Sequence, residues 1–269
     1  MTTAASKGTA LITGASAGIG AVYADRLARR GYDLILVARN RDRFNQLAAR
    51  LTAETGRTVE TLGADLSADE GIRLVERVLR TDSSITLLVN NAGVGATASL
   101  LASDPAKMDA MIALNVIALT RLARAAAEGF VARGVGSIIN ISSIVAVAPE
   151  LLNGVYGGTK AFVLAFSQSL HHELNDKGVR VQVVLPGAID TEFWDGAGLP
   201  VDNLPKAIVM NAYDLVDAAL AGFDQGELVT IPSLPEVADW HAFEHARKSL
   251  GPNLSRSQPA TRFNVSAAA

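Results

Sequence analysis

Cysteine is absent from this sequence of 269 residues, and neither sign of charge dominates it. Without cysteine, disulfide bonds, thiolate metal sites and thiol catalysis are excluded. The 24 Lys and Arg residues and the 27 Asp and Glu residues leave a formal net charge of −3. This balance provides no basic surface for nucleic acid or for an anionic membrane. We therefore expect neither of these partners.

Long hydrophobic segments are missing as well. Residues 1–8 lack the apolar stretch of a signal peptide. No uncharged apolar run approaches the roughly 20 residues that a transmembrane helix needs. These absences predict a cytoplasmic protein.

Short apolar runs alternate with longer helical patterns along the chain. Strands are predicted at 9–13, 32–37, 58–62, 85–89, 137–141, 179–185 and 228–231. Helices are predicted at 19–30, 41–55, 68–80, 104–132, 155–176, 214–221 and 236–250. This alternation indicates a parallel sheet covered by helices on both faces. We therefore expect an α/β fold, a Rossmann-like, doubly wound and mostly parallel sheet of seven strands in a single domain.

The first predicted strand ends at a glycine-rich turn, Gly14-Ala15-Ser16-Ala17-Gly18-Ile19-Gly20. Small residues let the backbone approach a pyrophosphate, and the following helix presents unpaired N–H groups and its positive end to that anion. The residues predicted to bind a dinucleotide here are Gly14, Ser16, Ala17, Gly18, Ile19 and Gly20. Their spacing differs from the commoner dinucleotide fingerprint. A glycine turn without a ligand is the alternative.

The end of the second predicted strand indicates which dinucleotide binds. A carboxylate at this place accepts from the 2′-hydroxyl of NAD, whereas an arginine pairs with the 2′-phosphate of NADP. The strand runs into Val37-Ala38-Arg39, so NADP(H) is the expected cofactor and Arg39 its 2′-phosphate ligand. A solvated basic start of the next helix is the alternative.

Two later strand ends face the same edge of the sheet. Asp65 and Leu66 follow the third strand, where they would contact adenine or cap the next helix. Asn91, Ala92 and Gly93 follow the fourth strand in the turn Asn-Asn-Ala-Gly, either facing the cofactor or bracing neighbouring strands.

Tyr156 and Lys160 are spaced so that they share one face of a helix. A nearby ammonium favours ionisation of a phenol, so Tyr156 is the candidate general acid and base and Lys160 the group that lowers its pKa. A half-buried ring beside a snorkelling amine is the alternative. Gly157 and Gly158 lie between them, although each glycine costs about 1 kcal/mol inside a helix.

Five features follow one another along the chain: the glycine turn, the Asn-Asn-Ala-Gly turn, Ser143, Tyr156 with Lys160, and Pro186-Gly187. In this order they resemble the motifs of the short-chain dehydrogenase/reductase family, and the resemblance covers roughly residues 9–231. The resemblance implies a catalytic tetrad of Asn115, Ser143, Tyr156 and Lys160. Ser143 is preferred to Ser142 because 156 − 143 = 13 is the usual family separation. The resemblance also implies cofactor contacts from Pro186, Gly187, Ile189 and Thr191. The basic residue that some NADP-preferring members carry in the glycine turn is replaced by Ala17.

The expected reaction is NADPH-dependent reduction of a ketone or aldehyde. The predicted pocket walls, at 94–101, 144–153 and in the lid, are mostly apolar, so we expect a small uncharged substrate. A 3-oxoacyl-carrier-protein reductase is a rival, and Arg121, Arg124 and Arg133 would form its docking patch. A non-catalytic NADP(H)-binding regulator is the second rival, and a broken tetrad would be its signature.

We expect residues 1–250 to form the dinucleotide-binding and catalytic domain, with a lid at 187–210 and a tail at 251–269. The resemblance implies a homodimer or homotetramer that pairs the helices at 104–132 and 155–176. His241 and His245 fit an inverted zinc-protease pattern, His-x-x-Glu-His, but without an evident third ligand we expect no metal site.

Overall fold

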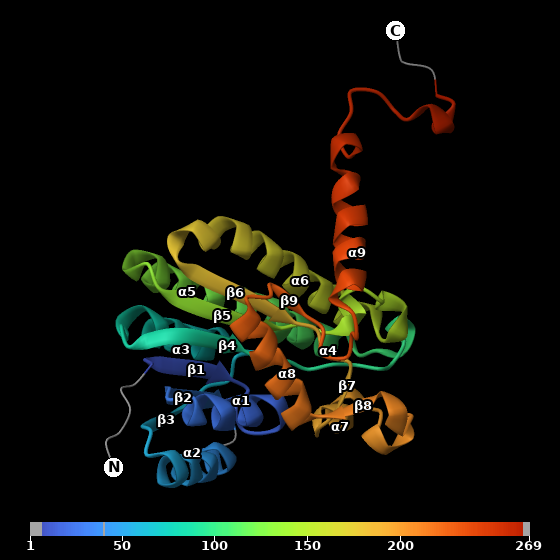
Figure 1. Ribbon diagram of the computed structural model, residues 1–269. Coiled ribbons are helices and arrows are strands. Elements are labelled where there is room, and N and C mark those ends of the chain that lie inside the picture. Colours follow the sequence, from blue (N-terminus) through green and yellow to red (C-terminus); the bar gives the residue numbers. More distant parts are fainter. Residues whose placement is uncertain (1–6, 40, 266–269) are drawn as a thin grey trace. The chain divides into compact units, whose positions relative to one another are not determined.

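The computed structural model describes residues 7–39 and 41–265. The chain divides into two compact units, Met1–Pro232 and Ser233–Ala269. The first unit is built on one seven-stranded sheet in the order β3-β2-β1-β4-β5-β6-β9, and every neighbouring pair of its strands is parallel (Figure 1). The predicted doubly wound α/β fold is therefore confirmed.

The strands lie close to their predicted positions. They are β1 (Thr9–Thr13), β2 (Asp33–Ala38), β3 (Val59–Gly63), β4 (Ile85–Asn90), β5 (Gly136–Ile141), β6 (Val179–Val184) and β9 (Val229–Thr230). All five residues of β1 are buried, as expected for a central strand with helices on both sides. Because β1 lies between β2 and β4, the chain reverses direction across the sheet at β1. In doubly wound sheets, ligands bind beside the carboxyl ends of the strands at this point.

Helices cover both faces of the sheet (Figure 1). They are α1 (Gly18–Arg29), α2 (Arg41–Thr55) and α8 (Ala212–Gln225) on one face, and α3 (Asp69–Thr81), α5 (Leu119–Arg133) and α6 (Gly154–Leu174) on the other. Each face has its own buried apolar cluster. Burial of these clusters is the main favourable term in the stability of the unit.

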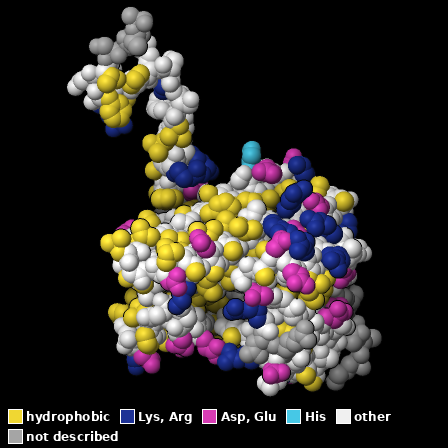
Figure 2. Space-filling model, turned by 180° about the vertical axis from the view of Figure 1, so that it is seen from behind, with side chains coloured by type: hydrophobic (Ala, Val, Ile, Leu, Met, Phe, Trp, Pro, Cys, Tyr) yellow, Lys and Arg dark blue, Asp and Glu magenta, His cyan; other side chains and the backbone are white. Residues whose placement is uncertain are grey.

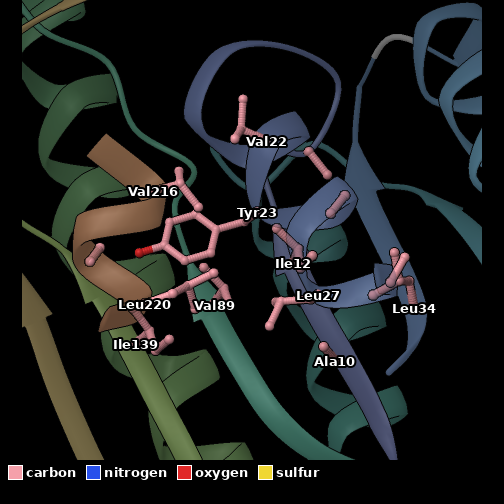
Figure 3. Close-up of a cluster of buried hydrophobic side chains, with 14 of the residues drawn as sticks. Ala10, Ile12, Val22, Tyr23, Leu27, Leu34, Val89, Ile139, Val216 and Leu220 are labelled. Atoms are coloured by element: carbon pink, nitrogen blue, oxygen red, sulfur yellow. The ribbon is translucent and has the colours of Figure 1, made fainter. Parts of the chain in front are cut away.

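Tyr23 lies inside the cluster formed by α1 and α8. Its ring is fully buried, and its hydroxyl points toward Val216 and Leu220 (Figure 3). Among the described residues, no hydrogen-bond partner of this hydroxyl is present. Burial raises the pKa of Tyr23 above its usual value of 10.0.

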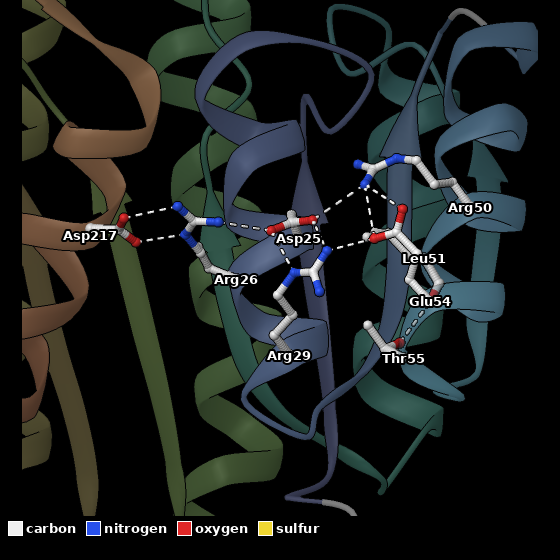
Figure 4. Close-up of polar contacts among 8 residues, drawn as sticks. All are labelled: Asp25, Arg26, Arg29, Arg50, Leu51, Glu54, Thr55 and Asp217. Atoms are coloured by element: carbon white, nitrogen blue, oxygen red, sulfur yellow. Dashed lines mark hydrogen bonds and ion pairs between the residues drawn. The ribbon is translucent and has the colours of Figure 1, made fainter.

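An ionic cluster around Asp25 joins the helices of the same face. Arg26, Arg29 and Arg50 all pair with the Asp25 carboxylate, which is largely buried (Figure 4). Arg26 also binds Asp217 of α8 through two nitrogens, at 2.6 and 2.9 Å. The cluster lowers the pKa of Asp25 against the opposing effect of its burial, and it links α1 to α2 and α8.

The predicted long helix is continuous but changes its winding. It consists of α4 (Pro105–Ile112), a π-helical segment (Ala113–Ala118) and α5. Asp104 caps its start by accepting from the N–H of Ala106 at 2.9 Å. By length and composition alone, Pro105–Arg133 could cross a membrane, and half of its most apolar window is buried inside the protein. Core helices of globular proteins pass the same test, and α5 supplies the core with residues such as Leu122 and Phe130.

The segment at 187–210, predicted as a loop, contains short regular elements. These are β7 (Ala188–Asp190), α7 (Phe193–Ala197) and β8 (Val209–Asn211), and β7 pairs with β8 in parallel. Trp194 fixes α7 to β7 by donating from Nε1 to the carbonyl oxygen of Ile189 at 2.8 Å. Elements of three to five residues are too short for a sequence period to reveal them.

The second unit contains α9 (Val237–Ser249), one residue shorter at each end than predicted. No residue of this helix is buried, although it carries the stacked pair Trp240 and Phe243. Glu244 of the zinc-protease pattern pairs with Arg247. In the described ranges 7–39 and 41–265, no three His, Cys, Asp or Glu side chains gather where a metal ion could bind.

Candidate active site

The glycine turn has the backbone geometry that a phosphate loop needs. Gly14 and Gly18 have positive φ angles of 66° and 54°, which L side chains rarely adopt. A side chain on Gly20 would lie 2.3 Å from the carbonyl oxygen of Gly14, so the turn closes tightly. α1 starts at Gly18 with Ala17 as an N-cap that makes no side-chain bond and with no acidic residue in its first turn. No carboxylate of the helix's own first turn therefore competes with an anion at this N-terminus.

Asn91 braces this turn. Its side-chain nitrogen donates to the carbonyl oxygens of Thr13 and Gly14 at 3.0 and 3.1 Å. The Thr13 hydroxyl accepts from the N–H groups of Asn91 and Ala92, both at 3.0 Å. Of the two roles left open for the Asn-Asn-Ala-Gly turn, bracing is what the structure supports. Thr13 was not predicted, because only its contact with a strand 76 residues away reveals the role.

Asn90, the other amide of the turn, points into the sheet rather than toward the turn. Its nitrogen donates to Oδ1 of Asn140 at 3.0 Å, and Asn140 donates to Ser167 at 2.9 Å. These buried bonds fasten β4 to β5 and α6, directly behind the strand ends that carry the site.

The adenosine end of the site is marked by Arg39 and Asp65. Arg39 is exposed directly after β2, as predicted, and in the described residues that follow this strand end no carboxylate precedes Asp42. Asp65 accepts from the N–H and the hydroxyl of Ser67 at 3.0 and 2.7 Å. These two bonds, with a smaller contribution from the charge of Arg39, lower the pKa of Asp65. Asp65 therefore organises the turn before α3, while Leu66 is buried in the core beneath it.

The two serines after β5 have different partners. Ser142 donates to the carbonyl oxygen of Lys160 at 2.7 Å and so fixes α6 to the end of β5. Ser143 caps the next turn and donates to the carbonyl oxygen of Pro186 at 3.4 Å. A hydrogen bond from Ser143 also opposes the rise in the pKa of Tyr156. The structure thus distinguishes a bracing serine, Ser142, from Ser143 beside the phenol.

Tyr156 and Lys160 lie on one face of α6, as their spacing predicts. Both are buried, with 5% and 7% of their surfaces exposed. Burial raises the pKa of Tyr156 to about 12 and lowers the pKa of Lys160 to about 8. The expectation that Lys160 lowers the pKa of Tyr156 is not supported by this geometry: the ammonium lies 5.8 Å from the ring centroid and donates to the carbonyl oxygen of Ile141 at 3.0 Å. Ser143, not Lys160, is the group that favours the phenolate here.

Asn115 lies in the π-helical segment, a kind of interruption that is frequent at functional sites. Its amide donates to the carbonyl oxygen of Val94 at 2.8 Å and accepts from the N–H of Val94 at 3.0 Å. Oδ1 of Asn115 and Nζ of Lys160 lie 3.1 and 3.5 Å from the position that a Cβ would take on Gly93. Only glycine leaves that space open, and both the amide and the ammonium border it.

Asn153 positions the catalytic helix and was not predicted. Its Oδ1 accepts from the N–H groups of Val155 and Tyr156 at 2.9 and 3.2 Å. Its Nδ2 donates to the carbonyl oxygen of Ala98 at 2.6 Å and to Ser103 at 3.1 Å. An asparagine before a helix is an N-cap signal, but its bond to the loop after β4 is visible only in three dimensions.

The residues after β6 reach both ends of the site. Pro186 accepts from the Ser143 hydroxyl and from the N–H of Ile144, the latter at 2.9 Å. Ile144 is also the neighbour that a side chain on Gly187 would meet, at 4.0 Å. Thr191 lies against the glycine turn, 3.2 Å from a Cβ placed on Gly18. Ile189 is buried in the core, so its main chain rather than its side chain faces the site.

A dinucleotide fits these residues. The positive-φ glycines and the uncapped N-terminus of α1 suit a pyrophosphate, and Arg39 suits a phosphate on the adenosine ribose. The open space at Gly93 borders both Asn115 and Lys160. The predicted tetrad is thus assembled near the carboxyl ends of β4 and β5, whereas Arg39 and Asp65 lie on the other side of β1, after β2 and β3.

The three arginines proposed for carrier-protein docking are already engaged. Arg121 pairs with Asp69 and Glu76, and Arg124 pairs with Glu128. Arg133 donates to the carbonyl oxygen of Ile85 at 2.8 Å. On the face seen in Figure 2, Lys and Arg side chains lie among Asp and Glu side chains. These arginines therefore do not form an uncompensated basic patch.

Comparison with known proteins identifies the class that this fold and tetrad define. A family model described as short chain dehydrogenase matches residues 8–198, which is most of the chain. The chain belongs to the short-chain dehydrogenase family. It is accordingly an oxidoreductase that interconverts alcohols and carbonyl compounds.

Three relatives are similar over most of their length. A short-chain dehydrogenase from Sphingobium yanoikuyae, solved in complex with NADPH, is 50% identical with a TM-score of 0.92, over 94% of this chain and 98% of that one. A bulky-bulky ketone specific alcohol dehydrogenase from Comamonas testosteroni is 45% identical with a TM-score of 0.89, over 96% and 99%. An oxidoreductase of Staphylococcus epidermidis, described as uncharacterized, is 31% identical over 207 residues, 74% of this chain and 88% of the relative.

Proposed function

We propose that this enzyme reduces uncharged, hydrophobic ketones or aldehydes with NADPH and catalyses the reverse alcohol oxidation with NADP⁺. The observation that carries the proposal is the assembled tetrad: Ser143 is bonded to Tyr156, and Asn115 and Lys160 both border the space left by Gly93. The NADPH bound by the Sphingobium relative and the ketone specificity of the Comamonas relative support the same reaction.

The cofactor would lie along the strand ends. The N-terminus of α1 and the glycine turn would hold the pyrophosphate, Arg39 the 2′-phosphate, and Lys160 the nicotinamide ribose. Pro186, Gly187 and Thr191 would face the nicotinamide carboxamide. When bound, NADPH supplies the hydride.

The chain's own residues manage the proton and the carbonyl oxygen. Ser143 and Tyr156 hold that oxygen by donating hydrogen bonds to it, which stabilises the negative charge that develops there. Tyr156 then gives its proton to the oxygen. Burial keeps the pKa of Tyr156 near 12, so its hydroxyl carries a proton at neutral pH. Lys160, whose pKa burial lowers to about 8, exchanges protons readily near neutrality and is positioned with Asn115 to restore the proton of Tyr156.

Apolar surroundings favour an uncharged substrate. Tyr156 packs with Met111, Val145 and Phe193, and no described Lys or Arg lies between Thr191 and Val201. Glu150 adds a negative charge in the predicted pocket wall, while the charge of Glu192 is balanced by its ion pair with Arg43. An anionic substrate would find no cation within this segment to bind it.

Oxidation of NADPH with a panel of ketones tests the proposal. Tyr156→Phe should reduce kcat by about 10²–10⁴-fold, because it removes the proton donor and little else. Tyr213→Phe, at an exposed tyrosine of α8, is the matched control and should retain activity. Equal turnover by Tyr156→Phe would contradict the mechanism, and no turnover by the wild type with any ketone would favour the NADP(H)-binding regulator.

The same assay tests the cofactor. Arg39→Asp should lower the ratio of kcat/KM for NADPH to that for NADH by about 10–100-fold, the equivalent of one charge-assisted hydrogen-bonded contact. An unchanged ratio would contradict the role of Arg39.

The proposal extends to assembly and location. We place the enzyme in the cytoplasm as a homodimer or homotetramer in which α4, α5 and α6 form the interface. Ile112, Ile117 and Phe162 support this assembly, because these large apolar side chains on the two long helices are 38–48% exposed. Residues 187–210 would act as the substrate lid, and 251–269 would remain outside the catalytic domain.

A further inference from the structure

Phe193 occupies the space beside the catalytic phenol. It is the first residue of α7, and its ring centroid lies 5.9 Å from that of Tyr156 at an interplanar angle of 47°. The ring also packs with Met111 and Val145, which are buried against Tyr156. Tyr156 and Ser143 are only 5% and 7% exposed, so a carbonyl group that reaches the Tyr156 hydroxyl must fit beside the Phe193 ring.

Gly95 provides the position in which this ring rests. A Cβ built on Gly95 would lie 2.2 Å from Cζ of Phe193 and 3.0 Å from both of its Cε atoms. Gly95 is not among the glycines with positive φ, so its backbone would accept alanine. The glycine is required here by the space that the ring takes and not by the conformation of the chain.

The short helix that carries Phe193 is held against the same loop. The N–H and the hydroxyl of Thr97 both donate to the carbonyl oxygen of Ala197, at 3.1 and 2.8 Å. At the other end, Glu192 pairs with Arg43 of α2 at 2.5 Å. Because these contacts hold α7 in place, rotation of the Phe193 side chain can change the space beside Tyr156 without moving the helix.

On the basis of the proposed ketone reduction, we propose that the Gly95–Phe193 pair determines the size of the substrate. The Phe193 ring forms the wall against which the larger apolar substituent of the ketone packs. The absence of a side chain on Gly95 determines the distance between this ring and Tyr156. Truncating the ring widens the pocket on this side. Adding a methyl group at Gly95 pushes the ring toward Tyr156 and narrows it.

Ratios of kcat/KM for a bulky ketone, benzophenone, and a small one, acetone, test this with the full-length enzyme and NADPH. Phe193→Ala should raise the benzophenone-to-acetone ratio about tenfold and Gly95→Ala should lower it about tenfold, the scale expected for reshaping an apolar pocket. In the Phe193→Ala background, Gly95→Ala should have no further effect, because the clash is gone. Gly154→Ala is the matched control, since an added Cβ there meets nothing within 4 Å.

A second measurement, tryptophan fluorescence quenching, detects a displacement of the Phe193 ring without substrate turnover. Trp194 follows Phe193 with ring centroids 5.6 Å apart and is 7% exposed, and the chain's other tryptophan is Trp240. In a Trp240→Phe background, Gly95→Ala should increase acrylamide quenching of Trp194, whereas Gly154→Ala should not. If Phe193→Ala does not fold, Phe193→Leu, which keeps an apolar side chain, replaces it in the turnover assay.

The outcomes separate the two proposals. Unchanged ratios in Phe193→Ala and Phe193→Leu, or additive effects of Gly95→Ala and Phe193→Ala, overturn the size-determining pair while ketone reduction stands. Absence of ketone turnover by the wild type overturns the proposed function and this inference together.

Discussion

Tyr23 shows how a single buried atom affects stability. Its hydroxyl lies among apolar side chains that include Val216 and Leu220 of α8, without a hydrogen-bond partner among the described residues (Figure 3). Leaving such a group unsatisfied costs about 1–3 kcal/mol. We predict that Tyr23→Phe raises the free energy of unfolding by about 1 kcal/mol, measured by urea denaturation at pH 7. Tyr213→Phe, at an exposed ring, should leave it unchanged.

The same substitution should alter the response to alkaline pH. The unfolded chain releases the Tyr23 proton near pH 10.0, whereas the folded chain holds it to higher pH because burial raises the pKa. Ionisation therefore favours the unfolded state, and the free energy of unfolding falls as the pH rises above about 10. In Tyr23→Phe this fall should be shallower, although Tyr156 still contributes to it up to its pKa of about 12. A parallel fall in both proteins would contradict the assignment.

Among individual site residues, those that carry chemistry were predictable and those that position them were not. The sequence proposed Tyr156 and Lys160 from their helical spacing and Ser143 from the family resemblance, and the structure brings all three together. Thr13 and Asn153 act through contacts with segments 50 or more residues away, which no local pattern encodes. The effect of Lys160 on the pKa of the phenol stays a prediction, because sharing a helical face does not determine where a flexible ammonium finds its hydrogen bond, here the carbonyl oxygen of Ile141.

At the scale of elements, the strands and long helices were predictable because their apolar residues repeat with the period of the structure. β7, α7 and β8 were not predictable, because they depend on bonds between separate segments. Trp194 of α7 donates to Ile189 of β7, and Thr97 donates to Ala197 of α7. Helix propensity alone would also predict no helix at the start of α6, because glycine disfavours helices, yet Gly157 and Gly158 are helical. Capping by Asn153 and burial of Tyr156 offset that preference.

The glycines of α6 give a prediction for this element. A Cβ on Gly158 would meet nothing within 4 Å, and Gly158 is not among the positive-φ glycines. We predict that Gly158→Ala raises the free energy of unfolding by about 0.5–1 kcal/mol through helix propensity, measured by thermal denaturation. Gly178→Ala is the contrasting variant, because a φ of 75° and a Gly134 oxygen 2.1 Å from the new Cβ make it destabilising. Loss of stability in Gly158→Ala would show that this glycine is needed for contacts outside the single chain.

At the scale of the whole molecule, the exposed apolar side chains of the long helices predict the interface. Ile117 and Phe162 are 48% and 38% exposed. Charged residues there should prevent burial of the contact, so Ile117→Glu with Phe162→Glu should yield monomers in light scattering after size-exclusion chromatography, with the fold retained by circular dichroism. Phe243→Glu in α9 is the matched control. Monomers from Phe243→Glu alone would instead assign assembly to the second unit.

The all-parallel sheet has a consequence for how the enzyme is made. Its seventh strand, Val229–Thr230, pairs with β6 and follows α8, which completes the core on one side of the sheet. Every strand pairing spans a long stretch of sequence, a topology that slows folding. A ribosome must therefore synthesise most of the polypeptide before its catalytic groups gain a finished scaffold. Nascent chains that already contain Tyr156 and Lys160 should remain inactive and dependent on chaperones until that last strand emerges.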